Sequence, residues 1–485
     1  MAYYDLREWI DALESEGELS KITAEVDWDL EIGGIAQHVF DKGGPALQFE
    51  NIKGYSDTVC TKLFTASVST YPRMAMMLGL PKNTHPREMI EVFRERMKTP
   101  IKPKILKTGP CKENILKGDD IDVMQFPTPL WHKRDGGRYM GTFEGTITKD
   151  PDTGWTNVGL YRRMVLDKNH TGIAIPIGQH IWRHFRKFRK GHKPLPMAVA
   201  IGWDPVLPAI AACPIPPEVD EYDVMGGIRQ APVELVKCET SDLMVPATAE
   251  IILEGEGSTN IDDFREEGPF GEYTGFYTSE AFKRPVFKIN CITHRNDPIL
   301  QGTLEGVPIN EDHRMTSIAN SAVLWTKLEK VVPGITAVNA DPCTAWTNVY
   351  VQVDNSFYGQ VPQIAGAIWS QETYFKNVFV CDTDVDIFDM SKVMWAIAYR
   401  VRPDKDILTF PGPIQMLDPV IHPSERIHPA VNKGLKMLID ATKPYEWPRA
   451  KEWFGEKYPP LAYPDDETME LVKNRWGEYK IDLDG

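Results

Sequence analysis

The sequence has few cysteines, and no pattern among them indicates a disulfide framework or a zinc motif. Only seven occur in 485 residues, they lie far apart, and no CxxC pair is present. An odd number of scattered thiols is typical of a protein in a reducing compartment. We therefore expect each cysteine to be a small core residue, and nothing marks any of them as an activated thiolate.

Long apolar runs and a secretory leader are also missing. No stretch approaches the roughly 18 uninterrupted apolar residues of a membrane span. The N-terminus, MAYYDLREWIDALESEGEL, carries charges throughout and lacks the basic start and apolar stretch of a secretory signal. We expect a cytoplasmic protein that does not enter a membrane.

An excess of positive charge is absent as well. The net charge of −15 opposes nucleic-acid binding over the whole surface, because phosphate backbones need a basic footprint. Residues 183–193, RHFRKFRKGHK, break this trend and carry Arg183, Arg186, Lys187, Arg189, Lys190 and Lys193. Two interpretations stay open for this segment: a solvated helix face or subunit contact, and a site for an anionic group such as a nucleotide-bearing substrate.

The length and texture of the chain predict three domains, since a domain averages roughly 150 residues. Residues 1–118 are expected to form an α/β domain that opens with an amphipathic helix over 5–17, where Asp5 and Glu8 make a capping box. Residues 119–312 contain short β-branched or aromatic runs, such as GTFEGTITKD and VFKINCITH, separated by turn residues. Such spacing favours a compact barrel or sandwich.

The last domain, 313–485, returns to strands followed by helices. SAVLWTKLEKVV and SKVMWAIAYRV have helical periodicity, and the first is expected to stop at Pro333. NVYVQV and NVFVCD have the continuous apolar character of buried strands. From Pro444 onward the chain is rich in Trp and Pro, which indicates a tail that embraces another surface.

The segment EEGPFGEYTG, residues 266–275, is the most informative for chemistry. It places Glu267 and Glu272 five residues apart around a turn that can aim both carboxylates at one spot. Two carboxylates held close compete over ionisation, so one can keep its proton near neutral pH and act as a general acid. A Glu pair flanking a turn is, however, usually solvated surface.

Candidate metal ligands lie upstream of this turn. Asn157 and Arg162 fall on a predicted strand and its exit, and IGQHIWRHF supplies Gln179 and His180. Asn and His, completed by a carboxylate such as Glu234 of APVELVKCE, suit manganese or magnesium bridging to a phosphate. A single histidine is nevertheless more often a hydrogen-bonded core residue than a ligand.

A zinc-protease site is excluded. His180 and His184 share the i, i+4 spacing of that motif, but Ile181 stands where HExxH has its glutamate.

Five segments in this order resemble the UbiD family of non-oxidative decarboxylases: NVGLYR, GQH, PVELVKCE with VPATAEIILEG, EEGPFGEYTG and VCDTDVDIFD. The resemblance runs from PALQFENIKGY to about residue 440. Ordered segments rich in ionisable and amide groups are hard to obtain by chance, so the resemblance outweighs the surface and core interpretations of the single residues.

The resemblance implies a role for each matched residue. Arg162 is implied to meet the substrate carboxylate, with Glu267 paired to it and Glu272 as the proton donor. The metal ligands and cofactor contacts are implied to be Asn157, His180 and Glu234, with Gln179 beside the flavin and Lys376 near the cofactor phosphate.

The resemblance also implies the fold and the cofactor. Family members have an N-terminal α/β domain, a central split β-barrel of flavin-reductase type and a C-terminal α/β oligomerisation domain, and they form dimers or hexamers. They use prenylated FMN held through its phosphate by Mn²⁺, with K⁺ nearby. Because metal and side chains hold the phosphate, no glycine-rich phosphate loop is expected.

The implied activity is reversible decarboxylation of an aromatic or α,β-unsaturated acid, with carbon dioxide as the second product, through a prenylated-FMN adduct. Candidate substrates include hydroxybenzoates, heteroaromatic acids and aryl-CoA thioesters such as phthaloyl-CoA. Two alternatives stay open: a flavin oxidoreductase on the same barrel, which would not need the paired carboxylates, and a non-catalytic subunit of a carboxylase complex, which would have lost them.

Overall fold

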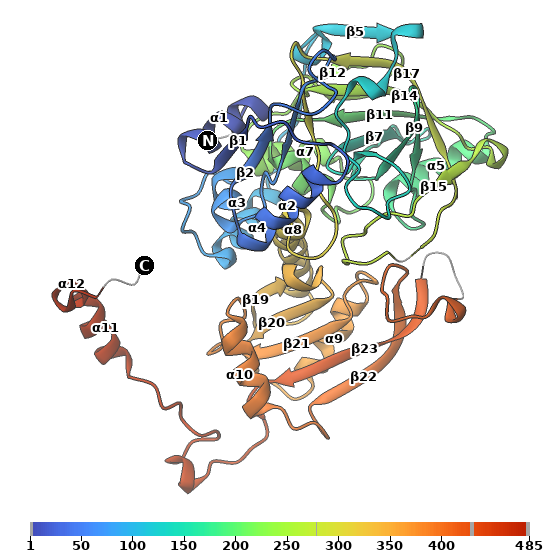
Figure 1. Ribbon diagram of the computed structural model, residues 1–485. Coiled ribbons are helices and arrows are strands. Elements are labelled where there is room, and N and C mark those ends of the chain that lie inside the picture. The colour runs from blue at the N-terminus through green and yellow to red at the C-terminus, as the bar shows by residue number, and fades with distance from the viewer. Residues whose placement is uncertain (1–2, 278, 427–430, 482–485) are drawn as a thin grey trace.

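The computed structural model describes residues 3–277, 279–426 and 431–481 (Figure 1). Its N-terminal part is a small four-stranded sheet with order β1-β2-β3-β18 and helices around it. The elements are α1 (Leu6–Ser15), β1 (Leu19–Ile22), α2 (Glu31–Lys42), β2 (Ala46–Phe49), β3 (Lys62–Thr65), α3 (Tyr71–Met77), α4 (Pro86–Met97) and β18 (Ile299–Gln301). Strand β18 comes from far along the chain and pairs in parallel with β3.

Helix α1 forms for the reasons that the sequence indicates. The Asp5 carboxylate accepts a hydrogen bond from the backbone N–H of Glu8 at 2.9 Å, which satisfies one free donor at the helix start. The apolar stripe is buried, as predicted, and consists of Leu6, Trp9, Ile10 and Leu13. The expected capping box is not closed, because the Glu8 side chain accepts from the N–H of Tyr4 rather than from that of Asp5.

The central part is a nine-stranded sheet in which every pairing is antiparallel. The strand order is β6-β9-β10-β17-β14-β11-β7-β8, with β5 paired to β17. The strands are β5 (Asn114–Lys117), β6 (Tyr139–Gly141), β7 (Gly145–Lys149), β8 (Thr156–Gly159), β9 (Arg163–Asp167), β10 (His170–Ile173), β11 (Leu195–Ile201), β14 (Ile251–Gly257) and β17 (Val286–His294).

This sheet must curl back on itself. Strands β8 and β9 lie six positions apart in the strand order, which would separate them by about 29 Å in a flat sheet with a spacing of about 4.8 Å. The link between them, residues 160–162, can span at most about 14 Å from Gly159 to Arg163. The two ends of the sheet therefore approach each other, and the link 160–162 lies at this seam.

Helices and two short sheets complete the central part. Helices α5 (His180–Lys190), α6 (Val206–Ala211) and α7 (Glu221–Arg229) all pack against the end of the sheet that carries β8. Strands β4 (Lys104–Ile105), β12 (Glu234–Lys237) and β13 (Met244–Pro246) form one short sheet, and β15 (Arg265–Glu267) and β16 (Phe282–Arg284) form the other. The predicted barrel or sandwich is thus a strongly curled antiparallel sheet with helices at one end.

Helix α8 (Glu311–Leu328) lies between the central part and the C-terminal sheet (Figure 1). It begins ten residues before the predicted helical segment, which starts at Ser321. Asn310 caps it: its side chain accepts from the N–H of His313 at 3.0 Å, and the ring of His313 accepts from the N–H of Asn310 at 3.0 Å. The first turn of α8 is buried but polar. Because it has no apolar periodicity, the sequence analysis did not predict it as part of the helix.

The C-terminal sheet has the order β19-β20-β21-β23-β22, and helices α9 (Gln360–Trp369) and α10 (Met390–Arg400) accompany it. Its strands are β19 (Ile335–Ala340), β20 (Asn348–Val353), β21 (Asn377–Asp382), β22 (Ile407–Gln415) and β23 (Val431–Ala441). NVYVQV and NVFVCD are β20 and β21, as predicted, and SKVMWAIAYRV forms α10. The predicted mixture of α/β and β regions is confirmed.

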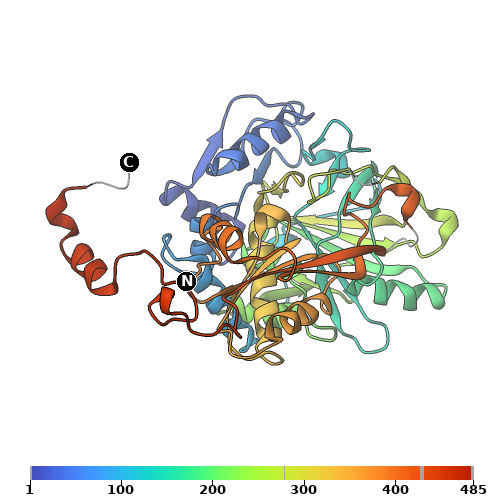
Figure 2. The ribbon, with the colours of Figure 1, turned by 90° about the horizontal axis from the view of Figure 1, so that it is seen from below.

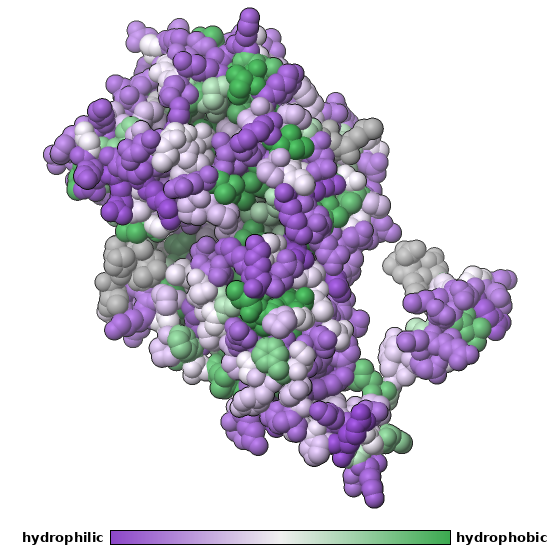
Figure 3. Space-filling view, turned by 180° about the vertical axis from the view of Figure 1, so that it is seen from behind, coloured by the Kyte–Doolittle hydropathy of each residue, from purple (hydrophilic) through white to green (hydrophobic). Residues whose placement is uncertain are grey.

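The chain ends in a tail that leaves the body of the molecule (Figures 2 and 3). Trp447, Trp453 and Tyr458 stack on one another near its start. Its two helices, α11 (Asp466–Asn474) and α12 (Trp476–Tyr479), bury no residue against the chain itself.

Two expectations about composition can be compared with the structure. No helix in the described ranges is long and apolar enough to cross a membrane. All seven cysteines are free, and six are buried, but Cys343 is exposed, so the prediction that each is a core residue was wrong at this position. Cys343 lies in a polar turn capped by Asp341, where its neighbours do not enclose it.

Candidate functional site

The turn after β15 positions two carboxylates of the site. Glu267 is the last residue of β15 and lies opposite Phe282 of β16. Gly268 follows with φ +92°, a left-handed conformation that favours glycine, and lets the chain reverse at once. A second turn closes at Glu272, whose carbonyl accepts from the N–H of Gly275 at 2.8 Å. The segment therefore folds back and directs both side chains inward.

Arg162 meets these carboxylates from the seam of the central sheet. Its Nε and Nη2 donate to the two oxygens of Glu267 at 2.9 and 2.8 Å, and its Nη1 donates to Glu272 Oε1. Two residues that the sequence analysis missed complete the group. Tyr139 donates its hydroxyl to Glu267 Oε1 at 2.8 Å, and Arg284 Nε lies 2.7 Å from Glu267 Oε2.

The environment drives the pKa values of the two carboxyls in opposite directions. Burial raises the pKa of Glu272 and the charge of Glu267 adds to this, while the charges of Arg162 and Arg284 and the hydrogen bond from Arg162 act against it without outweighing burial. Burial would also raise the pKa of Glu267, but the charge and hydrogen bonds of Arg162, with Arg284 and Tyr139, outweigh burial and lower it. Such a pair supplies one group that stays ionised and one that can carry a proton.

A second polar group lies at the helix end of the same sheet. Asn157 is buried in β8, His180 is the first residue of α5, and Glu221 is the first residue of α7. His180 Nδ1 lies 3.3 Å from Glu221 Oε1, and Glu221 Oε2 accepts from the N–H of Val158 at 3.3 Å. Trp155 packs edge-on against the His180 ring at 4.8 Å.

The chemistry of this group fits a divalent cation. It combines an amide, an imidazole and a carboxylate, a donor set suited to manganese or magnesium. Asn157 is buried in this group, and its amide oxygen is the atom that could bind a cation. The described residues contain no cluster of three His, Cys, Asp or Glu side chains arranged for a metal.

Glu234 is not part of this group, which corrects the predicted ligand set. It is the first residue of β12, accepts from Lys104 Nζ at 2.8 Å and from the Tyr4 hydroxyl at 3.3 Å, and contacts neither Asn157 nor His180. The pairing of β12 with β4 fixes this orientation.

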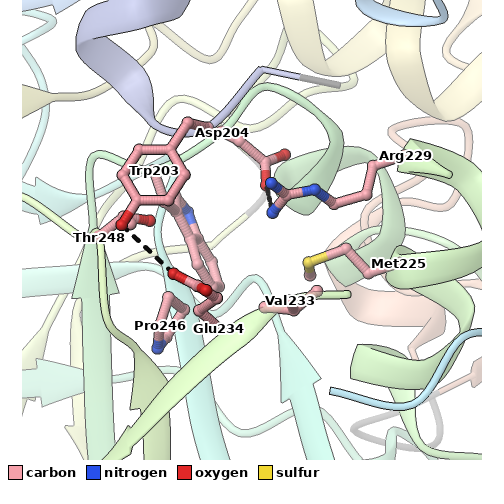
Figure 4. Close-up of a pocket in the computed structure, with 9 residues that line it drawn as sticks. Trp203, Asp204, Met225, Arg229, Val233, Glu234, Pro246 and Thr248 are labelled. Atoms are coloured by element: carbon pink, nitrogen blue, oxygen red, sulfur yellow. Dashed lines mark hydrogen bonds and ion pairs between the residues drawn. The ribbon is translucent and has the colours of Figure 1, made fainter. Parts of the chain in front are cut away.

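Figure 4 shows the surroundings of Glu234, a pocket of about 10 Å³ that also contains the Asp204–Arg229 ion pair. This volume admits about one water molecule and no larger ligand.

Glu221 could have been found from its position rather than from a motif. It follows Asp220, whose side chain accepts from the N–H of Tyr222 at 2.9 Å and caps α7. An acidic first turn after a capping Asp predicts a carboxylate at a helix N-terminus, where the helix dipole favours negative charge.

The two remaining predicted contacts have no hydrogen bond or ion pair to either group in the described chain. Gln179 precedes α5 and is exposed, and its side chain does not cap the helix. Lys376 precedes β21 and pairs with Asp418 at 2.6 Å.

A different lysine from the C-terminal sheet is directed inward. Lys436 of β23 is fully buried, and burial lowers its pKa to about 8. Its close partner is Glu372, whose pKa in turn responds to the charge of His180. Lys436 Nζ donates to the backbone carbonyl of Glu372 at 3.4 Å, and the sequence analysis did not identify this buried lysine.

Known proteins and family models match this chain over nearly its whole length. The family model of the 3-octaprenyl-4-hydroxybenzoate carboxy-lyase Rift-related domain matches residues 104–308, and those of the N-terminal and C-terminal domains of the same enzyme match residues 10–93 and 313–441. The pyrrole-2-carboxylic acid decarboxylase of Pseudomonas aeruginosa is 31% identical, with 98% of each chain covered. The phenolic acid decarboxylase of Bacillus subtilis is 34% identical over 100% of this chain and 99% of its own.

Solved structures give the same result. The open form of the vanillic acid decarboxylase of Sedimentibacter hydroxybenzoicus superposes with a TM-score of 0.86 at 32% identity, covering 99% of this chain and 100% of its own. The UbiD-class enzyme HmfF of Pelotomaculum thermopropionicum, in complex with FMN, superposes with a TM-score of 0.83 at 29% identity, covering 97% and 100%. The chain belongs to the UbiD family.

Proposed function

We propose that this protein is a carboxy-lyase that decarboxylates an aromatic or α,β-unsaturated carboxylic acid, reversibly, with Glu272 as the proton donor. The observation that carries the proposal is the meeting of Arg162 with two carboxyls whose pKa values are displaced in opposite directions. Family membership supports it, since the relatives with described activities are decarboxylases of aromatic acids.

The charge of each residue in the Arg162 group determines its role in the proposed reaction. The substrate carboxylate docks against Arg162, which stays charged because, although burial alone would lower its pKa, the charge and hydrogen bonds of the ionised Glu267 raise it. When carbon dioxide leaves, an electron pair remains on the carbon that carried it. Glu272, kept protonated by burial, delivers its proton to that carbon, and the return of a proton to Glu272 from solvent completes the cycle. Glu267, held ionised by Arg162 and Arg284, fixes the position of Arg162.

No side chain of the site can accept the electron pair, so a cofactor has to do so. We propose prenylated FMN, which is bound by a dimeric form of HmfF that superposes with a TM-score of 0.81 at 28% identity. When bound, it supplies the electron sink. Asn157, His180 and Glu221 would hold Mn²⁺ against its phosphate, with K⁺ nearby, and Gln179 and Lys376 would complete the cofactor contacts.

The test is direct. Protein purified without oxygen is expected to show the visible absorption and mass of prenylated FMN and to contain manganese. It should release carbon dioxide from at least one member of a panel of aromatic acids and their CoA thioesters. A preparation loaded with prenylated FMN and Mn²⁺ that decarboxylates no member of the panel would contradict the proposal.

The substrate can be narrowed by the basic groove on α5. This groove has a volume of about 970 Å³ and is lined by Trp155, Trp182 and the cations of α5. Because Trp155 also contacts His180, the groove adjoins the proposed metal group. Its charge favours a large anionic substrate, and we retain an aryl-CoA thioester such as phthaloyl-CoA as one candidate beside the free acids.

We also propose a homo-oligomer, a dimer or a hexamer, in which the tail packs on a neighbouring copy. Phe454 and Tyr463 of the tail are strongly exposed, and a single chain leaves this apolar surface in water. Light scattering at micromolar concentration should give a multiple of 55.0 kDa. Deletion of residues 444–485 should lower that mass, whereas a monomeric full-length chain would contradict the proposal.

We further propose that the central sheet is the split barrel of flavin-reductase type and that the domains span 1–118, 119–312 and 313–485. The curled central sheet supports the split barrel. The domain boundaries are approximate, because β18 belongs to the central segment of the chain but pairs with the N-terminal sheet. Residues 1–2 and 482–485 of the outer domains lie outside the described residues.

A further inference from the structure

The turn that carries Glu272, residues 268–277, packs on a loop that has no role in the chemistry described above. This loop, residues 132–136, precedes β6 and lies outside the five segments that carry the family resemblance. Its contacts with the turn therefore need an explanation of their own.

The backbone of the loop lies directly against the start of the turn. A Cβ built on Gly136 would lie 1.9 Å from the carbonyl oxygen of Gly268, so only a glycine allows this approach. The N–H of Gly136 donates to the carbonyl oxygen of Pro269 at 2.7 Å. The ring of His132 covers the next part of the turn, because a Cβ on Gly271 would lie 2.9 Å from its Nδ1. The loop and the turn thus form one closely packed unit.

Asp135 binds the backbone of the turn next to the proposed proton donor. Its Oδ1 accepts from the N–H of Gly271, the residue before Glu272, at 2.9 Å. The side chain is 0% exposed, and its Oδ2 accepts from the N–H of His132 at 3.1 Å, which fixes the carboxylate within its own loop. A hydrogen bond to a carboxylate is stronger than one between neutral groups. Asp135 therefore holds the chain directly before Glu272.

The chain directly after Glu272 has a separate anchor. His313, in the first turn of α8, donates from Nε2 to the carbonyl oxygen of Tyr273 at 2.6 Å. The carboxyl group of Glu272 is itself bound by Arg162. Three attachments thus set the position of this side chain, and Asp135 supplies the one that precedes it.

Proton delivery depends on this position more strongly than substrate docking does. The proton passes from Glu272 to one carbon, which must lie within about 2.6–3.2 Å of the donor. A displacement of about 1 Å can lower a rate about 100-fold. Docking uses Arg162, which is held by Glu267 and has no hydrogen bond or ion pair to the loop 132–136 in the described chain. Loss of the anchor should therefore affect delivery and not docking.

We propose that Asp135 is a positioning residue: by accepting from the N–H of Gly271, it fixes the place from which Glu272 delivers its proton. Asp135 acts through Glu272, without contact to the substrate. The inference rests on the proposed decarboxylase function and adds a residue on which its rate depends.

Asp135→Ala removes the acceptor and should separate kcat from KM. The substrate is the acid of the panel above that the enzyme loaded with prenylated FMN and Mn²⁺ turns over fastest, with vanillate, pyrrole-2-carboxylate and 4-hydroxybenzoate tried first. We expect kcat to fall about 10- to 100-fold and KM to stay within about threefold, because Arg162 still docks the carboxylate. In heavy water, a single turnover of the variant should release carbon dioxide before deuterium appears at the vacated carbon, whereas the two events coincide in the wild type.

Two variants of the same hydrogen-bond network show whether the acceptor is what matters. Asp135→Asn keeps an oxygen that can accept from the N–H of Gly271 and should bring kcat to within about threefold of the wild type. Tyr277→Phe removes the other donor to the same oxygen, a hydroxyl 3.3 Å away, and should leave kcat unchanged. A kcat of Asp135→Asn as low as that of Asp135→Ala, with both proteins folded, would overturn the proposal.

Asp122→Ala is the matched control for stability. Asp122 Oδ1 also accepts one backbone N–H at 2.9 Å, that of Met124, but at the start of a short helix outside the turn. Thermal unfolding measures what the loss of such a bond costs in each alanine variant. An equal fall of kcat in the two variants would show a general structural effect and would contradict a role for Asp135 in positioning.

Amide hydrogen exchange, followed by mass spectrometry, gives a readout that needs no turnover. The segment 268–277 should exchange at least about 10-fold faster in Asp135→Ala than in the wild type, because the N–H of Gly271 loses its acceptor, and Asp122→Ala should show no such change. Unchanged exchange of this segment, or an unchanged kcat in Asp135→Ala, overturns the inference. If the loaded wild type decarboxylates no acid of the panel, the proposed function fails, and the exchange of 268–277 decides separately whether Asp135 holds the turn.

Discussion

The two polar groups of the central sheet differ in how the chain assembles them. Arg162, Glu267 and Glu272 come from the seam of the sheet and from one tight double turn, so most of their geometry is local. Asn157, His180 and Glu221 come from a strand and from the first residues of two separate helices. The first group is closed by short ion pairs, whereas the second contains a single His–Glu contact of 3.3 Å.

This difference shows in which group the hydrogen bonds of the protein alone satisfy the charged side chains. Around Arg162 the hydrogen bonds of the chain satisfy the charges, which pre-organises the group for a reaction. Around His180 the contacts are fewer and longer, and an amide, an imidazole and a carboxylate come together, a donor set that would suit the proposed cation. Each variant below changes one of the two groups. The property that the variant loses, such as turnover or manganese binding, shows what that group does.

Glu272→Gln should give the largest effect. The amide keeps the shape and the hydrogen bond to Arg162 but carries no acidic proton, so turnover should fall by roughly 100- to 10,000-fold while cofactor content stays near that of the wild type. Single-turnover assays in heavy water should show release of carbon dioxide without deuterium at the vacated carbon. Normal deuterium incorporation at a normal rate would assign the proton to another residue.

The pH dependence of the wild type provides a second check on the same residue. Burial raises the pKa of Glu272, so its protonated form persists at pH values where an ordinary glutamate is ionised. The rate should therefore decline as pH rises through that raised pKa, because the ionised form has no proton to deliver. The Gln variant should lack this decline, and its presence there would exclude Glu272 as its source.

Glu267→Gln should act on stability as well as on rate. It leaves Arg162 and Arg284 without their shared anion in a buried position, which costs about 3 kcal/mol of the free energy of unfolding. Since the pKa of Glu267 is lowered in the folded state, its contribution is present above the unfolded pKa and is lost as pH falls through the folded pKa. Denaturant unfolding of both proteins should thus show a difference at pH 7 that shrinks below about pH 4.

Glu221→Gln should affect the second group alone. Loss of an outer-shell partner weakens metal binding about 10- to 100-fold, so loss of a proposed ligand should weaken Mn²⁺ binding at least that much. Manganese content by mass spectrometry and affinity by calorimetry measure the effect. Full manganese occupancy in this variant would show that Glu221 is not a ligand.

The sequence predicted the parts of the structure whose signal is local. The strands NVYVQV and NVFVCD, the first helix and the five-residue spacing of Glu267 and Glu272 each depend on neighbours along the chain. The start of α8 was missed because a buried polar turn has the composition of a loop, and only the Asn310 cap marks it. Tyr139 and Arg284 were missed because no spacing along the chain shows them: the pairing of β15 with β16 brings Arg284 close to Glu267, and the Tyr139 hydroxyl reaches it from β6.

The sequence analysis named Glu234, whereas Glu221 is the glutamate that contacts His180 in the structure. This difference also depends on packing that the local sequence does not show. Motif order identified a glutamate downstream of His180, but the side chain that reaches His180 depends on how α7 packs against β8. Thirteen positions along the chain separate the two candidates, and both are compatible with the same ligand chemistry. Only the three-dimensional packing distinguishes them.

Glu234→Gln should therefore have the smallest effect, and it is the matched control for Glu221→Gln. Both variants remove one carboxylate charge and keep the side-chain volume. Glu234 pairs with a lysine that is largely exposed and with the hydroxyl of an exposed tyrosine, and exposed pairs of this kind contribute little to stability because water and salt screen them. Manganese content, cofactor content and the thermal midpoint should all match the wild type within the error of measurement. If Glu234→Gln loses manganese and Glu221→Gln retains it, the ligand assignment drawn from the geometry is wrong and the one from the motif order is right.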